Sequence, residues 1–461
     1  MSRLTFNTNP STLKMTRLFK KPTSIQLIVA GFIFLIFIGA FLLTLPSASS
    51  SGYRQSFLDA LFTAGSAVTT TGLVVVDTGS FYSRFGQIII LALFQIGGLG
   101  YMIIITFVVL GIGGRLSISG QTLLRQSITR PTPVDMIRFA KIILLFTLVF
   151  ELAGTIFLGL SWMRFFPCGK AFYMAAFHSV SAFCTAGFSL FPDSLKAYNK
   201  CYSINLIISL LALGGGIGFF CLYELFVLLP EKRFMKQAIR LSTHTKIVLS
   251  STALLILGGA GIIWVAETGA QDSTIFLRPF MTSIFQAVSA STTTGFNTIE
   301  IGNMHTSSLW TILLLMFVGA SPGGTGGGIK TVSFVLLLVF LRSYLSGRND
   351  IFIFKNRIPQ ETMRKVFSIS ITAMVWIFTA TGILMYTEKA AALHILFQVV
   401  SALGTVGLST GITPEMSSAG KVVIILSMFI GRAGPLAIAY SLVGRPKPAS
   451  FTYPEADIVV S

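Results

Sequence analysis

The chain has 461 residues, of which 53% are hydrophobic and only 11% are charged. A soluble domain carries about 25% charged residues, so this composition excludes an ordinary soluble enzyme. Lys and Arg outnumber Asp and Glu by 34 to 16 and give a net charge of +18. The basic residues concentrate in alternate short loops, which indicates a polytopic membrane protein in contact with lipid and argues against nucleic acid as a partner.

Apolar stretches of about 20 residues, the length that crosses a bilayer, recur along the chain. A cleaved signal peptide is the alternative interpretation of the first stretch, because Pro46-Ser47-Ala48-Ser49 resembles a cleavage site. An apolar stretch of about 21 residues is long for a signal peptide, however, and favours a retained span. The sequence predicts eight transmembrane helices near residues 25–45, 86–111, 139–161, 203–229, 247–266, 308–345, 366–387 and 421–442.

The distribution of basic residues predicts the orientation of these helices. With the N-terminus placed inside, the two tails and the loops 112–141, 230–246 and 342–365 hold 23 of the 34 Lys and Arg residues. Basic residues are retained on the cytoplasmic side of a membrane. Residues 1–24 and 443–461 are therefore expected to be cytoplasmic tails.

Four outer segments, each lying between two predicted spans, repeat one another. Each has a Phe ten residues before a glycine, Ser-Ala six and five residues before it, Thr two residues before it, and Leu or Phe directly after it. The glycines are Gly72, Gly187, Gly295 and Gly407. Repetition at this period predicts an all-α membrane protein built from four units of span, re-entrant pore loop and span. The predicted units are residues 25–111, 136–229, 246–345 and 365–442.

The repeated segments have the properties of a cation filter. Non-helical backbone at membrane depth must be buried in protein or line water. Four like segments around one pore, with pseudo-fourfold symmetry, would direct carbonyl oxygens and the negative ends of short helices toward a cation. Glycines that only pack helices are the alternative, but four in register favour the filter. The predicted ion-binding residues are Thr70, Thr71, Gly72, Thr185, Ala186, Gly187, Thr293, Thr294, Gly295, Thr405, Val406 and Gly407.

No ring of carboxylates accompanies this filter, so selection is expected from backbone oxygens. The acidic residues beyond it would only concentrate cations; they are Asp77, Asp193, Glu300 and Glu415. The four cysteines form no CxxC pair and have no His partner at metal spacing, so we expect no transition-metal site. A disulfide between Cys168 and Cys201 stays open.

Four pore-loop units with one filter glycine each resemble the Ktr/Trk/HKT superfamily of potassium transporters, over nearly the whole chain. The short segment before the first span makes the match best to the KtrB branch, the membrane subunits of bacterial Ktr systems. The resemblance implies a potassium uptake protein of the bacterial inner membrane that performs no enzymatic chemistry and carries no organic cofactor. It further implies homodimers, stimulation by Na⁺, and a KtrA-like cytoplasmic nucleotide-binding ring as regulator.

The sixth apolar stretch is interrupted by a glycine-rich sequence that no helix tolerates. A Walker A loop is the alternative, but Ile329 precedes Lys330 and no strand precedes the glycines. We expect residues 319–331 to form an intramembrane loop that obstructs the pore just inside the filter, as the resemblance also implies. The predicted gating residues are Gly323, Gly324, Thr325, Gly326, Gly327, Gly328, Lys330 and Arg432.

Arg432 lies in an apolar span, where an arginine costs about 2.5 to 3.5 kcal/mol or more. We expect it to project into the inner pore or to bind loop carbonyls; the alternative is that it reaches the cytoplasmic edge. Lys330 could equally cap the loop. Glu151 and Glu224 permit proton coupling, although structural pairing is favoured, and core packing is the default for His178.

Two other classes of function remain as alternatives. A secondary symporter coupled to Na⁺ or H⁺ could use the same pore site, although such carriers have fewer repeats and helices broken at the midplane. An intramembrane enzyme would need a His-carboxylate or Ser-His constellation, and the four histidines are scattered among loops and helix ends. Neither alternative accounts for the fourfold motif.

Overall fold

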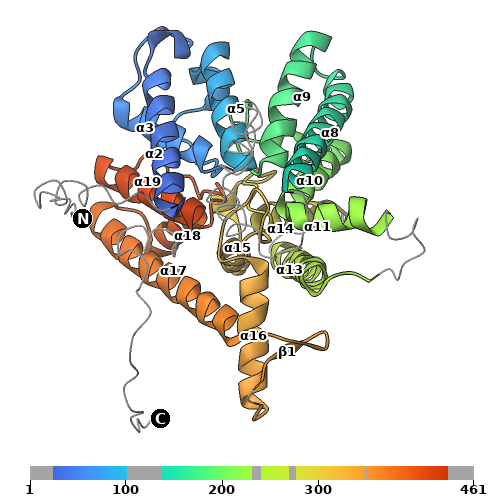
Figure 1. The fold of residues 1–461 in the computed structure, drawn as a ribbon. Coiled ribbons are helices and arrows are strands. Elements are labelled where there is room, and N and C mark those ends of the chain that lie inside the picture. Colours follow the sequence, from blue (N-terminus) through green and yellow to red (C-terminus); the bar gives the residue numbers. More distant parts are fainter. Residues whose placement is uncertain (1–23, 101–135, 231–239, 269–276, 349, 435–461) are drawn as a thin grey trace, which may run out of the picture.

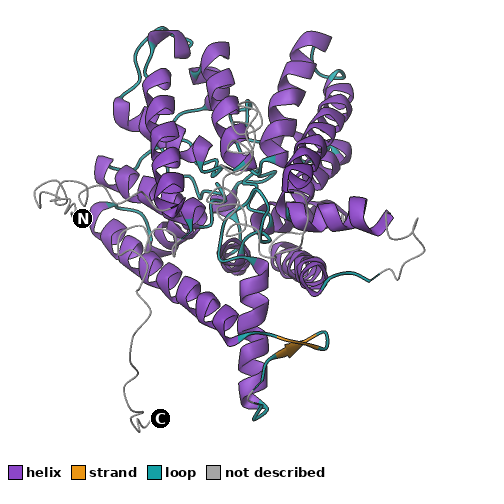
Figure 2. Ribbon diagram, viewed as in Figure 1, coloured by secondary structure: helices purple, strands orange, loops and turns teal. Residues whose placement is uncertain are grey.

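The computed structural model describes residues 24–100, 136–230, 240–268, 277–348 and 350–434. The two predicted cytoplasmic tails lie outside the described residues, apart from Ser24. The same holds for the predicted ends of the second and eighth spans, residues 101–111 and 435–442. Helices make up most of the described chain, and a short hairpin of β1 (Phe352–Ile353) and β2 (Asn356–Arg357) stands beside its lower end (Figure 2).

One order of elements occurs four times along the chain: a first helix, a short buried helix and a returning helix (Figure 1). The first helices are α2 (Ser24–Leu43), α8 (Met136–Trp162), α13 (Thr243–Thr268) and α17 (Gln360–Thr387). The short helices are α3 (Phe57–Val68), α9 (Cys168–Phe183), α14 (Leu277–Ser291) and α18 (Ala392–Leu403). The returning helices are α5 (Arg84–Leu99), α10 (Tyr202–Gly216), α15 (Thr306–Val318) and α19 (Ser418–Ala433).

Two of the returning helices are followed by a further helical stretch. After α10 the chain bends by 96° and continues as α11 (Phe219–Tyr223) and a π-helical turn η3 (Glu224–Leu228). After α15 it passes through a non-helical segment before α16 (Thr331–Leu345). The remaining elements are short outer turns: η1 (Pro46–Ala48), α4 (Thr78–Phe81), η2 (Lys196–Tyr198) and η4 (Ile301–Asn303).

Three helices in the described ranges are long and apolar enough to cross a membrane: Arg138–Trp162, Thr243–Thr268 and Gln360–Thr387. The bent pair after Tyr202 brings this number to four at most. The described helices of the other predicted spans do not meet the same criteria of length and hydropathy, so eight crossings remain a prediction.

The core explains two columns of the repeated motif. The Phe ten residues before each glycine and the apolar residue directly after it are all buried, each with at most 4% of its surface exposed. Burying such a side chain contributes roughly 1.5 to 3 kcal/mol. These side chains hold the short helices and the segments that follow them inside the protein. They are Phe62, Phe177, Phe285 and Phe397 before the glycines, and Leu73, Phe188, Phe296 and Leu408 after them.

The outer faces of the first helices are apolar as well. Phe34 on α2 is 64% exposed and Phe378 on α17 is 77% exposed, and Leu145, Leu148 and Leu152 are exposed on α8. Faces of this size on a soluble protein would be a liability, whereas lipid is a favourable solvent for them. The fold therefore has an apolar exterior around a centre that is rich in buried threonine and serine.

Candidate ion-conduction site

The four repeated segments are numbered as copies 1 to 4, after Gly72, Gly187, Gly295 and Gly407. In each copy the short helix ends and the Thr two residues before the glycine takes a positive φ, between 50° and 57°. A positive φ is a genuine outlier for a β-branched residue and costs about 1 to 3 kcal/mol. The strain recurs in all four copies, at Thr70, Thr185, Thr293 and Thr405.

One backbone hydrogen bond closes the turn in every copy. The N–H of the residue before the glycine donates to the carbonyl oxygen of the Ser six residues before the glycine, at 2.8 Å each time. This bond fixes the residue between the strained threonine and the glycine against the end of the short helix. The four bonds run from Thr71 to Ser66, Ala186 to Ser181, Thr294 to Ser289 and Val406 to Ser401.

The glycines bring the copies together. Gly72, Gly187, Gly295 and Gly407 have φ values of 87°, 68°, 84° and 91°, a region that favours glycine. A Cβ atom on Gly72 would lie 2.5 Å from the carbonyl oxygen of Ala186 in copy 2, and one on Gly187 would lie 2.7 Å from that of Thr294 in copy 3.

The same contact continues from copy 3 to copy 4 and from copy 4 back to copy 1. A Cβ on Gly295 would collide with the carbonyl oxygen of Val406, and one on Gly407 with that of Thr71. The contacts 1–2, 2–3, 3–4 and 4–1 form a closed ring of backbone. No side chain fits at any of the four glycines.

An open vestibule of about 400 Å³ lies outside this ring and is lined by all four glycines. Of the four acidic residues expected beyond the filter, Asp77 and Asp193 line the vestibule, whereas Glu300 and Glu415 are not among its lining residues. Lys196 also lines it. Lys196 Nζ lies 3.8 Å from Asp193 and 4.0 Å from Glu300, which links the outer parts of copies 2 and 3. The sequence alone predicts no role for this lysine.

On the other side of the ring lies the glycine-rich segment, residues 319–330, which connects α15 to α16. It is bound to the bend between α10 and α11 by three backbone hydrogen bonds. Two are donated by the segment and one by the first residue of α11. They join Ser321 N–H to Gly216 O at 3.0 Å, Thr325 N–H to Gly215 O at 3.1 Å and Phe219 N–H to Gly323 O at 3.0 Å.

The glycine-rich segment also contacts the strained threonine of every copy. The hydroxyl of Thr70 lies 3.3 Å from the carbonyl oxygen of Thr325, and the hydroxyls of Thr185 and Thr325 lie 3.0 Å apart. The N–H of Gly327 donates to Thr293 Oγ1 at 3.2 Å. A Cβ on Gly327 would collide with the hydroxyl of Thr405. The segment thus lies directly across the inner side of the ring.

The two basic side chains predicted to take part in gating, Lys330 and Arg432, donate hydrogen bonds to backbone carbonyl oxygens. Lys330, which has a φ of 86°, donates from Nζ to the carbonyl oxygen of Gly326. Arg432, in the last turn of α19, donates to the carbonyl oxygens of Thr325 and Gly97, and to that of Gly98 at 3.3 Å. Arg432 therefore faces the glycine-rich segment and α5, as expected for an arginine that binds loop carbonyls.

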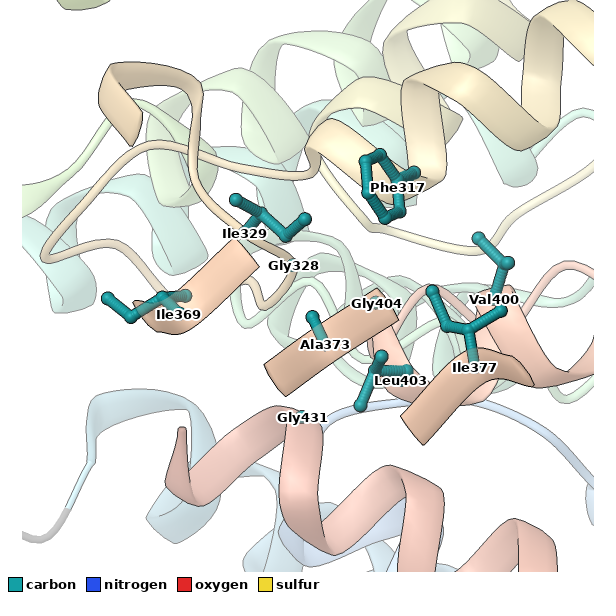
Figure 3. A pocket seen from close by; sticks show the side chains of 10 residues that line it. All are labelled: Phe317, Gly328, Ile329, Ile369, Ala373, Ile377, Val400, Leu403, Gly404 and Gly431. Carbon is teal, nitrogen blue, oxygen red and sulfur yellow. The ribbon is translucent and has the colours of Figure 1, made fainter. Parts of the chain in front are cut away.

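A small apolar cavity of about 20 Å³ lies beside the inner end of the segment (Figure 3). Gly328 and Ile329 of the segment line it, together with Phe317 of α15, side chains from α17 and α18, and Gly431 of α19. Figure 3 shows Ile329 and Phe317 on one side and Ala373, Leu403 and Ile377 on the other.

A second repeat, not predicted from the sequence, lies at the ends of the returning helices. Each of these helices is followed by a glycine with positive φ, and in three copies another glycine stands three residues earlier. At these earlier glycines the carbonyl oxygen at the end of the short helix leaves no room for a Cβ. The four-residue sequences are Gly97–Gly100, Gly215–Gly218, Met316–Gly319 and Gly431–Gly434. Arg432 occupies the second position, where two other copies have glycine.

The buried carboxylates have hydrogen-bond partners. Glu151 accepts from Gln95 at 3.2 Å and lies 3.9 Å from the Cys184 thiol. Glu224 accepts from the backbone N–H and the hydroxyl of Ser242 at the start of α13. Both arrangements agree with structural pairing.

His178 and the cysteines also have ordinary surroundings. His178 is buried, with Nδ1 2.8 Å from the carbonyl oxygen of Met174, as core packing requires. The four cysteines are free thiols. Within the described ranges no group of three His, Cys, Asp or Glu side chains is placed to hold a metal ion.

Comparison with known proteins places the chain in a family. The TrkH family of cation transport proteins matches residues 4–453. Ktr system potassium uptake protein B of Bacillus subtilis (strain 168) is 36% identical over 94% of this chain and 96% of its own length, and the Vibrio alginolyticus protein of that name is 35% identical over 94% of each. Potassium/sodium uptake protein NtpJ of Enterococcus hirae is 33% identical over 97% of this chain and 100% of its own length.

A solved structure supports the same assignment at the level of the fold. The potassium transporter TrkH from Vibrio parahaemolyticus matches with a TM-score of 0.68 and 23% identity, over 90% of this chain and 85% of that one. The predicted helical membrane fold is thus confirmed in its coarse form, and the predicted resemblance is confirmed. The chain belongs to the TrkH family of cation transport proteins.

Proposed function

We propose that this chain is the ion-conducting subunit of a potassium uptake system, with one pore formed by its four copies. The observation that carries this proposal is the closed ring in which the glycine of each copy contacts a carbonyl oxygen of the next. Relatives named for potassium uptake at 33 to 36% identity support potassium as the transported ion. The chain has no role in covalent chemistry.

The proposed filter consists of the three residues that end at each glycine, arranged with pseudo-fourfold symmetry. A potassium ion would exchange part of its hydration shell for the carbonyl oxygens of these residues. The short helices α3, α9, α14 and α18 end beside them, and the carbonyl end of a helix carries partial negative charge that favours a cation. Four such ends around one axis stabilise a monovalent cation without a fixed carboxylate.

The proposed gate is the glycine-rich segment, and its position across the inner side of the ring is the proposed closed state. Its contacts with all four threonines support a blocking position directly inside the ring. Arg432 and Lys330 hold its carbonyl oxygens and add positive charge on the conduction path, which repels a cation. Conduction then requires the segment to leave the threonines.

The membrane arrangement is part of the proposal. The basic loops and the apolar outer faces of the first helices support eight crossings with cytoplasmic termini. The resemblance to bacterial Ktr proteins supports residence in the bacterial inner membrane. The proposed units are residues 25–111, 136–229, 246–345 and 365–442, with the gating loop at residues 319–331.

A regulatory assembly is also part of the proposed function. Two relatives carry the name of a Ktr system, which implies further components, and a KtrA-like nucleotide-binding ring on the cytoplasmic side of a homodimer fits that name. Stimulation by Na⁺ fits a relative named for both potassium and sodium uptake.

Ion flux into liposomes that contain the full-length chain tests the proposal. With a potassium gradient alone, uptake should carry current and stop at the potassium equilibrium potential, because nothing else is transported. Flux that requires a gradient of Na⁺ or H⁺ would instead support the symporter alternative. Absence of potassium flux with and without a cytoplasmic regulator would reject the proposed function.

A further inference from the structure

Two of the four filter segments are tied to their short helices by a pair of threonine hydroxyls. In copy 1, Thr69 Oγ1 lies 2.7 Å from Thr71 Oγ1 and donates to the carbonyl oxygen of Gly65 at 2.7 Å. A hydroxyl has a single hydrogen. Thr69 donates its hydrogen to the carbonyl oxygen of Gly65, so the hydrogen between the two threonines comes from Thr71.

Copy 3 contains the same arrangement at equivalent positions. Thr292 Oγ1 lies 2.7 Å from Thr294 Oγ1 and donates to the carbonyl oxygen of Val288 at 2.6 Å. The direction of donation is therefore again from Thr294 to Thr292 to the helix. All four hydroxyl-bearing residues are buried, with at most 2% of their surface exposed, so water does not compete for these bonds.

Copies 2 and 4 lack this relay because of their residues. Copy 2 has Cys184 and Ala186 at the two positions, and the Cys184 thiol is directed to Gln95 Oε1 at 3.2 Å. Copy 4 has Gly404 and Val406, neither of which has a polar side chain. Around the ring, whose order is 1–2–3–4, copies with the relay alternate with copies without it.

We propose that the Thr71–Thr69 and Thr294–Thr292 hydroxyl relays are selectivity-determining positioning elements, which fix the filter carbonyls of two opposite copies at the spacing that suits potassium. The inference rests on the proposed filter and adds to it which side chains set its dimensions. The residue before each glycine supplies the carbonyl that contacts the glycine of the preceding copy. Tethering its side chain to the helix restricts rotation of that peptide unit.

Copy 4 shows that this place in the ring accepts the side chain of valine, because Val406 is fully buried there. Thr71→Val and Thr294→Val therefore remove the hydroxyl at nearly constant shape. Thr71→Ser and Thr294→Ser keep the hydroxyl and should restore the relay. Thr69→Val interrupts the relay one step earlier, outside the three filter residues of copy 1.

The test measures the ratio of K⁺ to Na⁺ uptake rates in liposomes containing the full-length chain. Each Val variant should lower the ratio by about 2- to 10-fold, the factor that one hydrogen bond of typical net strength is worth. The Ser variants should stay within about twofold of the parent, since each keeps one donated hydrogen bond. Thr63→Val is the matched control, because Thr63 is a buried threonine of α3, nine residues before Gly72, that donates to Asp59 O and accepts from the Tyr82 hydroxyl. Its ratio should not change.

Three outcomes would overturn the relay. In the first, the ratio of uptake rates is unchanged in Thr71→Val, Thr294→Val and Thr69→Val but altered in Gly295→Ser, which would reject the relay and leave the filter intact. In the second, the Ser and Val variants shift the ratio equally, which would assign the effect to side-chain shape. In the third, neither the Val variants nor Gly295→Ser changes the ratio, which would reject the proposed filter as well. If a filter variant does not reach the membrane, Thr69→Val still decides between the first outcome and the proposal.

Discussion

Arg432 donates a hydrogen bond to the carbonyl oxygen of Thr325, 107 residues earlier in the chain. The same guanidinium binds Gly97 and Gly98 at the end of α5, more than 330 residues away. One side chain thus joins the fourth returning helix, the glycine-rich segment and the first returning helix. Thr325 in turn contacts the strained threonines of copies 1 and 2.

This relationship predicts the effect of Arg432→Gln. Loss of a charge-assisted hydrogen bond of about 1.5 to 3 kcal/mol should free the glycine-rich segment and raise potassium flux by about tenfold or more. Initial uptake rates in liposomes, normalised to protein in the membrane, measure this change. Arg364→Gln on the exposed start of α17 is the control and should leave the rate unaltered. Reduced flux at normal protein levels would reject a gating role for Arg432.

Deletion of Gly324 to Gly328 tests the segment itself. These residues provide the contacts with Thr70, Thr185 and Thr293, so their removal should open the inner side of the ring. We expect faster potassium uptake that no longer responds to a cytoplasmic regulator. A deletion variant that is abundant in the membrane yet slower than the parent would show that the segment supports conduction instead of blocking it.

The register of the four glycines could be predicted from the sequence, because each copy repeats the same residue types around a backbone position that only glycine fills. The ring order could not be predicted, because it depends on which carbonyl meets which glycine across more than 100 residues. The strain at Thr70 and its equivalents was also missed. Thr-x-Gly suggests that the glycine carries the positive φ, whereas the structure places a positive φ on both residues.

The bend in the fourth predicted span is indicated in the sequence by a cluster of glycines, which a hydropathy profile does not reveal. Gly214-Gly-Gly-Ile-Gly218 lies in the middle of an apolar stretch, and a hydropathy average treats glycine as neutral. The break in the sixth span could be predicted, because Pro322 and five glycines in the six positions from Gly323 to Gly328 are incompatible with a helix. Lys196 was missed for a different reason: its position in the vestibule depends on how the loop after copy 2 folds over copy 3.

Gly295→Ser tests the filter directly. A side chain at this position would meet the carbonyl oxygen of Val406 and would force a residue other than glycine to hold a φ of 84°. We expect the displaced carbonyl to weaken discrimination, so Na⁺ uptake should rise relative to K⁺ uptake. The measurement is the ratio of the two uptake rates.

Gly261→Ser is the matched control for this filter variant, because nothing lies within 4 Å of a Cβ at that position on α13. Its ratio of uptake rates should equal that of the parent. An unchanged ratio in Gly295→Ser, with normal amounts of protein, would contradict the assignment of Gly295 to the filter. A changed ratio in both variants would assign the effect to a general perturbation of the membrane domain.

The seam between copies 4 and 1 supplies the last prediction. Lys421 at the start of α19 lies 2.7 Å from Asp59 in the first turn of α3, and the two side chains are 16% and 24% exposed. The pair joins the last and first units, which the chain itself does not connect. Partial burial strengthens the attraction between the two charges. Removal of one partner leaves the charge of the other partly buried and without compensation, which destabilises the protein.

Lys421→Met and Asp59→Asn should each lower the thermal unfolding temperature of the purified protein, and the double variant should lose less than the sum of the two. A coupling energy of about 1 kcal/mol is expected for a pair of this exposure. Lys365→Met removes the exposed pair with Glu361 on α17, at 2.6 Å, and should leave the unfolding temperature unchanged because solvent screens that pair. Additive losses at Lys421 and Asp59 would mean that apolar packing between α19 and α3 closes the ring without help from this ion pair.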